Sequence, residues 1–296
     1  MALQFLLQQL DTAGTYARIL FVDFSSAFNT IIPALLQDQL SQLHVPDSTC
    51  RWITDFLPDR KQHMRLGKHV SDPRTISTGS PQGCVLSPLL FSLYTNSCTS
   101  SHQSVKLLKF ADNTTLIGLI SGGDESAYRW EMDHLVTWCW ENHLELNALK
   151  TVEMVVDFRK NATPPTPITL FDSPVTAVTS FRFLGTIIAL DLKREQNICS
   201  LIKKAQQRMF FLRQLKKFNL PRTMMVNFYT FITESILTES ITIWYATAKD
   251  KGRLQRVIRS AEKVIGCNLP SLHNLHASRT LRRAGKIVAD PSHPGP

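Results

Sequence analysis

The pattern of hydrophobic and polar residues predicts a mixed α/β portion in the first two thirds of the chain. Residues 17–24 (ARILFVDF) are apolar almost throughout and rich in β-formers, as in a buried strand. Residues 105–120 form two β-rich runs broken at Asp112 and Asn113, which predicts a hairpin with this polar pair at its turn. A helix is predicted over 123–144, with one apolar stripe. The stripe consists of Tyr128, Met132, Leu135 and Cys139.

Shorter patterns complete the α/β portion, and a helical portion follows it. From 193 to 266 the pattern is almost entirely helical and its faces are basic, whereas 289–296 is Pro-rich and expected to be disordered. Further helices are predicted at 2–10, 30–43, 47–57 and 84–98, strands at 152–158 and 180–188, a basic hairpin-like stretch at 59–76, and a Gly/Pro/Ser loop at 77–83.

Composition narrows the class of partner. Among 296 residues, 33 Lys and Arg stand against 24 Asp and Glu, for a formal charge of +9. A basic balance of this size suits a polyanion, because neutralising phosphates releases their condensed counterions. The six cysteines form no CxxC pair, the N-terminus lacks the basic and apolar regions of a signal peptide, and no apolar run is long enough to span a membrane. The sequence therefore predicts an intracellular protein, nuclear or cytoplasmic, without structural zinc.

Two carboxylates are the first candidates for chemistry. Asp23 ends an apolar strand, and Asp112 lies at the tip of the predicted hairpin. An antiparallel sheet can bring such strand ends together, and two neighbouring carboxylates repel unless a divalent cation bridges them. Either residue taken alone is more simply explained as a turn residue or a helix cap.

The order of the segments resembles the motifs of a known family. VDFSSAFNT is similar to motif A of reverse transcriptases, STGSPQGCVLSPLLFSLYTN to motif B, and KFADN to motif C. ENHLELNALKT is similar to motif D and FRFLG to motif E. Their order and spacing resemble those of the reverse transcriptases of non-LTR (LINE-type) retrotransposons, and the resemblance extends from about residue 10 to residue 267. The motif sequences resemble vertebrate, fish-type elements in particular.

This resemblance implies an α+β fold. The expected architecture is a right-hand polymerase palm, an antiparallel sheet with packed helices, followed by an all-helical thumb, with the fingers mostly missing. The implied division is a remnant of the fingers at 1–16, the palm at 17–190, the thumb at 191–267 and a partly disordered tail at 268–296.

The resemblance also implies a two-metal site. Asp23 and Asp112 would bind two Mg²⁺ or Mn²⁺ ions, and the backbone carbonyl of Phe24 would complete one coordination shell. In such a site the cations activate the primer 3′-hydroxyl and neutralise charge on the transferring phosphoryl group. Lys150 matches a motif D lysine near the leaving pyrophosphate, although it also fits a solvated surface lysine.

Further residues are implied to hold the substrates, namely an RNA template, a DNA primer and deoxynucleoside triphosphates. Phe28 matches the position that excludes a 2′-hydroxyl, although an ordinary core Phe has the same pattern. The resemblance implies a nucleotide and template loop at Gly79, Pro81, Gln82 and Gly83, and a primer grip at Phe183, Leu184 and Gly185. It implies thumb contacts to the nucleic-acid backbone, or else a solvated basic face, at Lys203, Lys204, Arg208, Arg213, Lys216 and Lys217.

The chain departs from the family pattern at its centre. The family has two adjacent Asp residues in motif C, but the second position here is Asn113, which can offer a carbonyl oxygen but no charge. Ser97 likewise stands where related elements usually carry Asp, and the fingers strands expected before motif A are absent from this sequence. We therefore expect weak polymerisation or none.

Other interpretations remain open. One is a nucleic-acid-binding remnant without catalysis, and another is an inert product that folds poorly. Residues 195–267 also resemble a region known as an AlkB-homologue N-terminal domain, which suggests a dioxygenase or a methyltransferase. However, none of the nine His residues begins the HxD pair that an iron dioxygenase needs, and no glycine-rich strand-to-helix turn suggests a methyl-donor site.

Overall fold

The computed structural model describes residues 10, 14–160, 165–242 and 248–290, which fold into two compact units divided between Val178 and Thr179. The helix predicted at 2–10 lies outside the described residues except for Leu10. Within the described ranges no helix is both long and apolar enough to cross a membrane.

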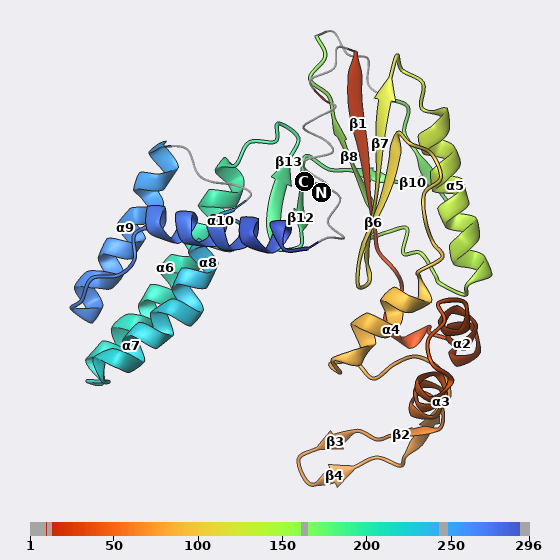
Figure 1. The fold of residues 1–296 in the computed structure, drawn as a ribbon, viewed down its shortest axis with the longest axis horizontal. Coiled ribbons are helices and arrows are strands. Elements are labelled where there is room, and N and C mark those ends of the chain that lie inside the picture. Colours follow the sequence, from red (N-terminus) through yellow and green to blue (C-terminus); the bar gives the residue numbers. More distant parts are fainter. Residues whose placement is uncertain (1–9, 11–13, 161–164, 243–247, 291–296) are drawn as a thin grey trace. The chain divides into compact units, whose positions relative to one another are not determined.

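The first unit is built on a five-stranded sheet in the order β11-β8-β1-β7-β6 (Figure 1). Its central strand β1 pairs antiparallel with β7 and with β8, and only the short β11 runs parallel to its neighbour. All eight residues of β1 are buried, as its apolar sequence predicts. The strand bounds are β1 Thr15–Val22, β6 Val105–Phe110, β7 Asn113–Ser121, β8 Val152–Val156 and β11 Thr176–Ala177.

The hairpin of β6 and β7 is confirmed, but its predicted turn is wrong by one residue. Phe110 pairs with Asn113, so the two-residue turn consists of Ala111 and Asp112. Ala111 has a φ of 52°, because a two-residue hairpin needs a left-handed residue at its first position. Asn113 is therefore the first residue of β7 and lies outside the two-residue turn.

Helices pack against the sheet and extend its hydrophobic core. Helix α5 (Ser126–Glu141) buries its predicted stripe against the sheet, with Tyr128 fully inaccessible. Leu36 of α2 and Phe91 of α4 extend the same hydrophobic core, which accounts for most of the burial in this unit. The other helical bounds are η1 Ala27–Asn29, α2 Pro33–Gln42, α3 Asp47–Phe56 and α4 Leu86–Tyr94.

A two-stranded ribbon follows α3 and leads into the loop at 77–83. In Figure 1 its outer strands β3 and β4 lie beyond α3, away from the sheet. The ribbon pairs Lys61 with Thr75 near its base and Leu66 with His69 at its tip, and it confirms the predicted basic hairpin. Its strands are β2 Arg60–Gln62, β3 Arg65–Leu66, β4 His69–Val70 and β5 Arg74–Ile76, and a separate small hairpin joins β9 Thr169–Leu170 to β10 Ser173–Pro174.

The second unit begins with a hairpin and continues as helices. The hairpin joins β12 (Ser180–Phe183) to β13 (Thr186–Ala189). Helix α10 (Leu272–Val288) corrects the expectation that residues after 267 form only a tail. Ser271 caps this helix by accepting a hydrogen bond from the Asn274 N–H at 3.2 Å. The remaining elements are α6 Glu195–Lys217, α7 Arg222–Phe228, the π-helical turn η2 Tyr229–Glu234, α8 Ser235–Leu237 and α9 Ala248–Ile265.

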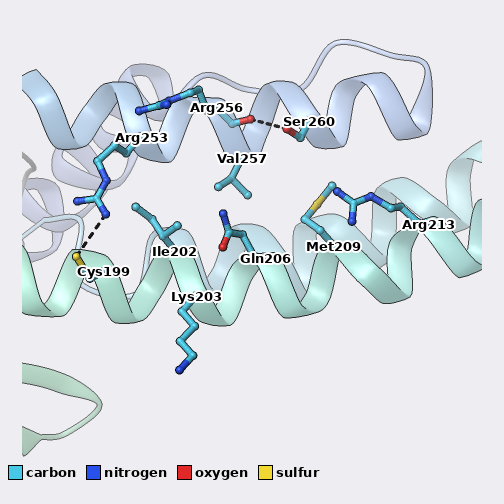
Figure 2. A pocket seen from close by; sticks show the side chains of 10 residues that line it. All are labelled: Cys199, Ile202, Lys203, Gln206, Met209, Arg213, Arg253, Arg256, Val257 and Ser260. Atoms are coloured by element: carbon cyan, nitrogen blue, oxygen red, sulfur yellow. Dashed lines mark hydrogen bonds between the residues drawn. The ribbon is translucent and has the colours of Figure 1, made fainter.

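Helices α6 and α9 pack along their length and leave a polar groove beside their contact. Met209 of α6 and Val257 of α9 belong to the buried core of this unit. The groove beside them has a volume of about 590 Å³ (Figure 2). Arg253 reaches across it to donate a hydrogen bond to Cys199 Sγ at 3.4 Å, whereas Lys203 points away from α9.

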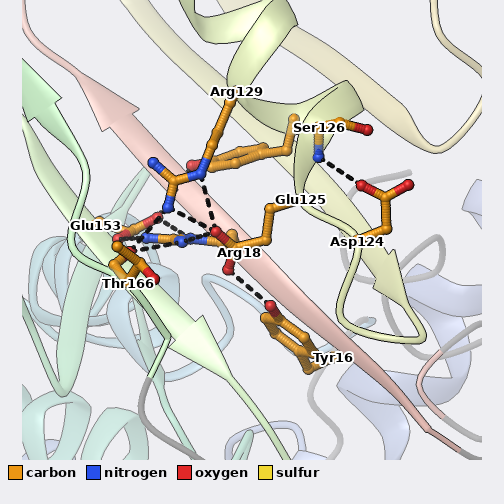
Figure 3. Close-up of polar contacts among 9 residues, drawn as sticks. Tyr16, Arg18, Asp124, Glu125, Ser126, Arg129, Glu153 and Thr166 are labelled. Carbon is orange, nitrogen blue, oxygen red and sulfur yellow. Dashed lines mark hydrogen bonds and ion pairs between the residues drawn. The ribbon is translucent and has the colours of Figure 1, made fainter.

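One buried arginine organises the charges inside the first unit. Arg18 lies in the middle of β1 and has no solvent exposure. Its guanidinium donates to both carboxylate oxygens of Glu153 at 2.7 Å, to Glu125 Oε2 at 2.7 Å and to the Thr166 carbonyl at 3.0 Å (Figure 3). A charge so deep in a core is tolerated because its donors are satisfied and two carboxylates face it.

Glu125 also accepts hydrogen bonds from two other side chains. The Tyr16 hydroxyl donates to Glu125 Oε1 at 2.7 Å, and Arg129 donates to Oε2 at 2.7 Å. Burial, with the hydrogen bond to Glu125, raises the pKa of Tyr16 to about 12. Gly118 lies opposite Arg18 in the register, and a methyl group there would collide with the Tyr128 ring that packs beneath the guanidinium.

Replacing Arg18 with Met is expected to destabilise the first unit by about 3–5 kcal/mol, because Glu153 would remain buried without a counter-charge. The measurement is urea unfolding followed by far-ultraviolet circular dichroism. The Arg18→Met/Glu153→Met double variant removes both charges and is expected to recover most of the loss. Equal destabilisation in the single and double variants would contradict this role of the ion pair.

The Glu125 contact predicts a pH dependence. Burial favours the protonated carboxyl, but the hydrogen bonds from Tyr16, Arg18 and Arg129 outweigh it and hold the pKa of Glu125 below its ordinary value. A depressed pKa contributes stability that is present above the unfolded-state value near ~4.3 and is lost as the pH falls through the folded value. Glu125→Gln should therefore be less stable than the wild type at pH 7, and the two unfolding midpoints should approach each other as the pH falls below the unfolded-state value. Midpoints that stay equally far apart at pH 3 would contradict this assignment.

Candidate active site

The ends of β1 and β7 bring the motif A and motif C residues to one edge of the sheet. Val22 is the last residue of β1 and pairs with Thr114. Asp23 follows directly after β1, and Asn113 directly precedes Thr114 at the start of β7, so Asp23 leaves the sheet at the end that carries the Ala111–Asp112 turn. Asp23 and Asp112 are partly exposed and Asn113 is exposed, so all three are open to solvent.

Backbone hydrogen bonds from the motif D segment fix the chain around Asp23. The Asn147 N–H donates to the Asp23 carbonyl at 2.8 Å, and the Ser25 N–H donates to the Glu145 carbonyl at 2.8 Å. Phe24 lies between these two bonds and bridges to Leu146. Because carbonyls alternate along an extended chain, the Phe24 carbonyl faces the other side, where β7 lies. This is the direction that its implied role as a metal ligand requires.

Lys150 lies beside the motif A carboxylate. Its Nζ is 3.9 Å from Asp23 Oδ2, and the two side chains are 71% and 44% exposed. An ion pair this long and exposed is weak, so the lysine side chain remains free to move to another anion. The neighbouring Thr151 is fully buried, and its hydroxyl accepts the Asp23 N–H at 3.2 Å. The structure thus places Lys150 beside Asp23.

Phe28 is held by aromatic packing. Its ring meets the fully buried Phe91 edge-on, with centroids 5.6 Å apart, and Phe24 meets the same Phe91 ring at 5.8 Å. Phe28 is itself only half-buried. Its ring is therefore fixed from one side and exposed on the other, which is compatible with both the gate and the core interpretations.

The motif B loop docks on the turn that follows motif A. The Gly79 N–H donates to the Ile31 carbonyl and the Ser80 N–H to the Phe28 carbonyl, both at 2.7 Å. Gln82 Nε2 donates to Asn29 Oδ1 at 3.2 Å. The structure therefore brings this loop against the segment that carries Phe28. Further along the loop, the Pro81 carbonyl accepts from the Ser87 hydroxyl at 2.5 Å, and Gly83 adopts a φ of 80°.

Arg60 and Lys109 position the site, and the sequence motifs indicated neither. Arg60 Nη2 donates to the carbonyls of Thr78 and Gly79 at 2.9 and 2.7 Å, which clamps the base of the ribbon to the motif B loop. Lys109 Nζ donates to the Cys98 carbonyl at 2.8 Å and also to the Thr95 carbonyl, beyond the end of α4. A lysine in a strand next to a helix C-terminus is the only sequence signal for this second contact.

The expected primer grip lies in the second unit. Leu184 and Gly185 form the turn of the β12–β13 hairpin with φ values of 46° and 89°, directly after Phe183. Asn197 is buried, and its Oδ1 accepts the Ile187 N–H at 3.0 Å, which ties this hairpin to α6. The hairpin geometry is thus present, and Asn197 is a positioning residue that the motifs did not reveal.

The expected thumb cations spread over more than one face of α6. Lys203 and Arg213 line the groove beside α9 together with Arg253 and Arg256, which the sequence analysis did not single out (Figure 2). Arg208 instead lies over the Phe211 ring, 6.0 Å from its centroid. Lys216 reaches the Lys263 carbonyl at 3.5 Å, Lys204 is half-buried, and Lys217 is exposed.

The oxygen donors at the sheet edge suit a hard divalent cation. Two carboxylates, the Asn113 amide and the Phe24 carbonyl are the ligand types that Mg²⁺ takes. Among the described residues, however, no group of three or more Asp, Glu, His or Cys residues is clustered closely enough to hold a metal ion. The residues therefore fit a cation site that has fewer charges than a three-carboxylate site.

Gly79→Ala is expected to destabilise the first unit by about 2–4 kcal/mol. Gly79 has a φ of 71°, and an added Cβ would lie 2.6 Å from the Asn29 Cα and 2.8 Å from the Phe28 carbonyl oxygen. Gly83→Ala is the matched control, because its φ is 80° but an added Cβ meets nothing within 4 Å. The control should lose only about 1–2 kcal/mol in chemical denaturation, and equal losses at both positions would contradict the docking of this loop.

Two protein families match parts of the chain. The family described as "Reverse transcriptase (RNA-dependent DNA polymerase)" matches residues 2–188. Residues 194–235 match the family described as "Alkylated DNA repair protein alkB homolog 8, N-terminal", which overlaps the first part of the segment 195–267 that resembles it.

Two curated Drosophila melanogaster proteins are similar to the chain. A probable RNA-directed DNA polymerase from transposon BS is 25% identical over 84% of this chain and 29% of that protein. A probable RNA-directed DNA polymerase from transposon X-element is 24% identical over 58% of this chain and 19% of that protein. The chain thus spans less than a third of the length of either relative.

Among solved structures, a telomerase from Candida tropicalis aligns with 98% of this chain and 50% of that chain, with 13% identity and a TM-score of 0.47. The family match covers well over half of the present sequence and includes Asp23, the Gly79–Gly83 loop and Asp112. The chain belongs to the reverse transcriptase (RNA-dependent DNA polymerase) family.

Proposed function

We propose that the chain is the palm and thumb portion of an RNA-directed DNA polymerase from a LINE-type retrotransposon, with an impaired metal site. The observation that carries this proposal is the register that puts Asp23 beside the Asp112 turn, with Lys150 Nζ 3.9 Å from Asp23 Oδ2. The substrates are an RNA template, a DNA primer and deoxynucleoside triphosphates. Palm functions are assigned to 17–190 and thumb functions to 191–267, to which α10 (Leu272–Val288) adds a further helix.

Asp23, Asp112 and the Phe24 carbonyl are the residues that would hold Mg²⁺ or Mn²⁺, with the Asn113 amide as a neutral fourth donor. A bound cation pair supplies activation of the primer hydroxyl and neutralisation of phosphoryl charge. Asn113 leaves the site one negative charge short, which weakens its attraction for two dications. This deficit explains why we expect low activity.

The remaining residues orient the substrates in this proposal. Lys150 is free to leave Asp23 and to place its ammonium near the departing pyrophosphate, where it can donate a proton or stabilise charge. Gly79 and Gln82 present a backbone and an amide side chain to the nucleotide and the template. In this proposal the exposed side of the Phe28 ring would exclude a 2′-hydroxyl, and the edge-on contact with Phe91 would hold the ring in place.

A second candidate is a nucleic-acid-binding remnant without catalysis. The absence of a third clustered carboxylate in the described part of the chain favours it. The two candidates share the basic surfaces and differ only at the metal edge. For the helical region that matches the AlkB-homologue family, no described cluster of iron ligands supports dioxygenase chemistry.

The deciding experiment is primer extension on an RNA template in Mg²⁺ and, separately, in Mn²⁺. The wild type is expected to incorporate few nucleotides, and Asn113→Asp to incorporate more, because the third carboxylate restores charge where dications bind. Asp23→Asn should abolish incorporation in both backgrounds while leaving the melting temperature nearly unchanged.

Robust processive synthesis by the wild type would contradict the impaired site. Activity that Asp23→Asn leaves unaltered would contradict the assignment of the site itself. Absence of incorporation in wild type and Asn113→Asp alike, with nucleic-acid binding intact, would favour the remnant.

A further inference from the structure

The ribbon between Arg60 and Ile76 is exposed along its whole length. Every residue from Lys61 to Thr75 is exposed, including Leu66 at 84% and Met64 at 76%. An isolated two-stranded hairpin is marginally stable at best, and this one buries no side chain of its own between those two residues. Packing therefore does not account for its composition, and its side chains are available to a partner.

The ribbon carries a net positive charge. Five of its residues are Lys or Arg and one is acidic, Asp72. Among the described residues, Lys61, Lys68 and Arg74 have no carboxylate within ion-pairing distance. Unpaired cations at this density attract a polyanion, because each phosphate that they neutralise releases a counterion. The apolar Met64 and Leu66 between them can contact the faces of unstacked bases.

A trough connects the ribbon to the candidate active site. Its volume is about 790 Å³, within the range of about 300–1,000 Å³ common for ligand sites. One wall comes from Lys61, Gln62 and His63 of the ribbon, and the other from Asn29, Pro81 and Gln82 of the site loops. The clamp from Arg60 to the Thr78 and Gly79 carbonyls fixes the two walls relative to each other.

The chemistry of the trough distinguishes between nucleic-acid forms. The side-chain amides of Asn29, Gln62 and Gln82 each carry a donor and an acceptor, which can pair with base edges. A duplex hides those edges, whereas an unpaired strand presents them. The cations supply phosphate contacts along the ribbon, and the amides lie where the ribbon meets the catalytic loops.

We propose that the ribbon and its trough bind the single-stranded RNA template just before it enters the active site. This role rests on the proposed copying of RNA and adds a binding surface to it, with Lys61, Lys68 and Arg74 as the principal phosphate contacts.

The test measures binding of a fluorescent 12-nucleotide single-stranded RNA in EDTA, without cation or nucleotide, across a series of salt concentrations. Lys61→Gln/Lys68→Gln/Arg74→Gln should weaken binding roughly tenfold or more and should lower the slope of log K against log salt by about 2, at about 0.7 per phosphate contact. Because the measurement needs no catalysis, a chain that cannot polymerise can still confirm the ribbon, and an active chain can still refute it.

The matched control is Arg51→Gln/Lys106→Gln/Lys160→Gln, which removes the same charge from exposed positions of the first unit that lie outside the ribbon. It should keep the wild-type affinity and slope, and Lys61→Arg/Lys68→Arg should keep both as well. Unaltered melting temperatures establish that all variants fold.

Three outcomes would overturn the proposal. The first is equal loss in the ribbon and control variants, which would mean that only total charge matters. The second is a wild type that binds duplex RNA as tightly as single-stranded RNA. The third is a ribbon variant that loses affinity for a deoxynucleoside triphosphate but not for the RNA, which would assign the trough to the triphosphate.

Discussion

The buried Arg18 guanidinium is the interaction on which the arrangement of the first unit depends. It lies in the central strand and holds Glu153 of β8 and Glu125 beside α5 at 2.7 Å, so one charge joins two strands and a helix. A one-residue slip of β1 would move this charge to the other face of the sheet, away from both carboxylates. The register of β1 is thereby fixed, and Asp23, five residues or roughly 17 Å further along the strand, is delivered to the β6–β7 turn.

The middle of β1 and the end of β1 therefore perform different tasks. In the middle, the satisfied hydrogen bonds of the buried Arg18 make a rigid support. Directly after the end, Asp23 is 44% exposed and its ion pair with Lys150 is long. Rigid support behind an open, loosely neutralised carboxylate suits a site that must accept cations and substrates repeatedly. The Gly79 loop is held in the same way, by backbone contacts to Phe28 and Ile31 on one side and by Arg60 on the other.

Much of this could be read from sequence, because the relevant signals are local. The apolar run of β1, the Tyr128 stripe of α5 and the basic ribbon all follow from periodicity and composition. The turn of the motif C hairpin was misplaced by one residue, because two polar residues look like a turn whereas the ladder made Ala111 and Asp112 the turn residues. Helix α10 was missed because its apolar positions are few and it is held largely by arginine contacts, such as Arg279 to the Thr238 carbonyl at 3.2 Å.

Other features had no local signal. Arg18, Arg60, Lys109 and Asn197 act on residues distant in sequence, and an isolated Arg or Lys does not reveal its partner.

The central claim is that Asp23 and Asp112 form one shared cation site, which Mn²⁺ titration followed by electron paramagnetic resonance tests most directly. The account predicts that Asp23→Asn and Asp112→Asn each abolish the bound Mn²⁺ signal of the wild type. Retention of that signal in either single variant would contradict a shared site.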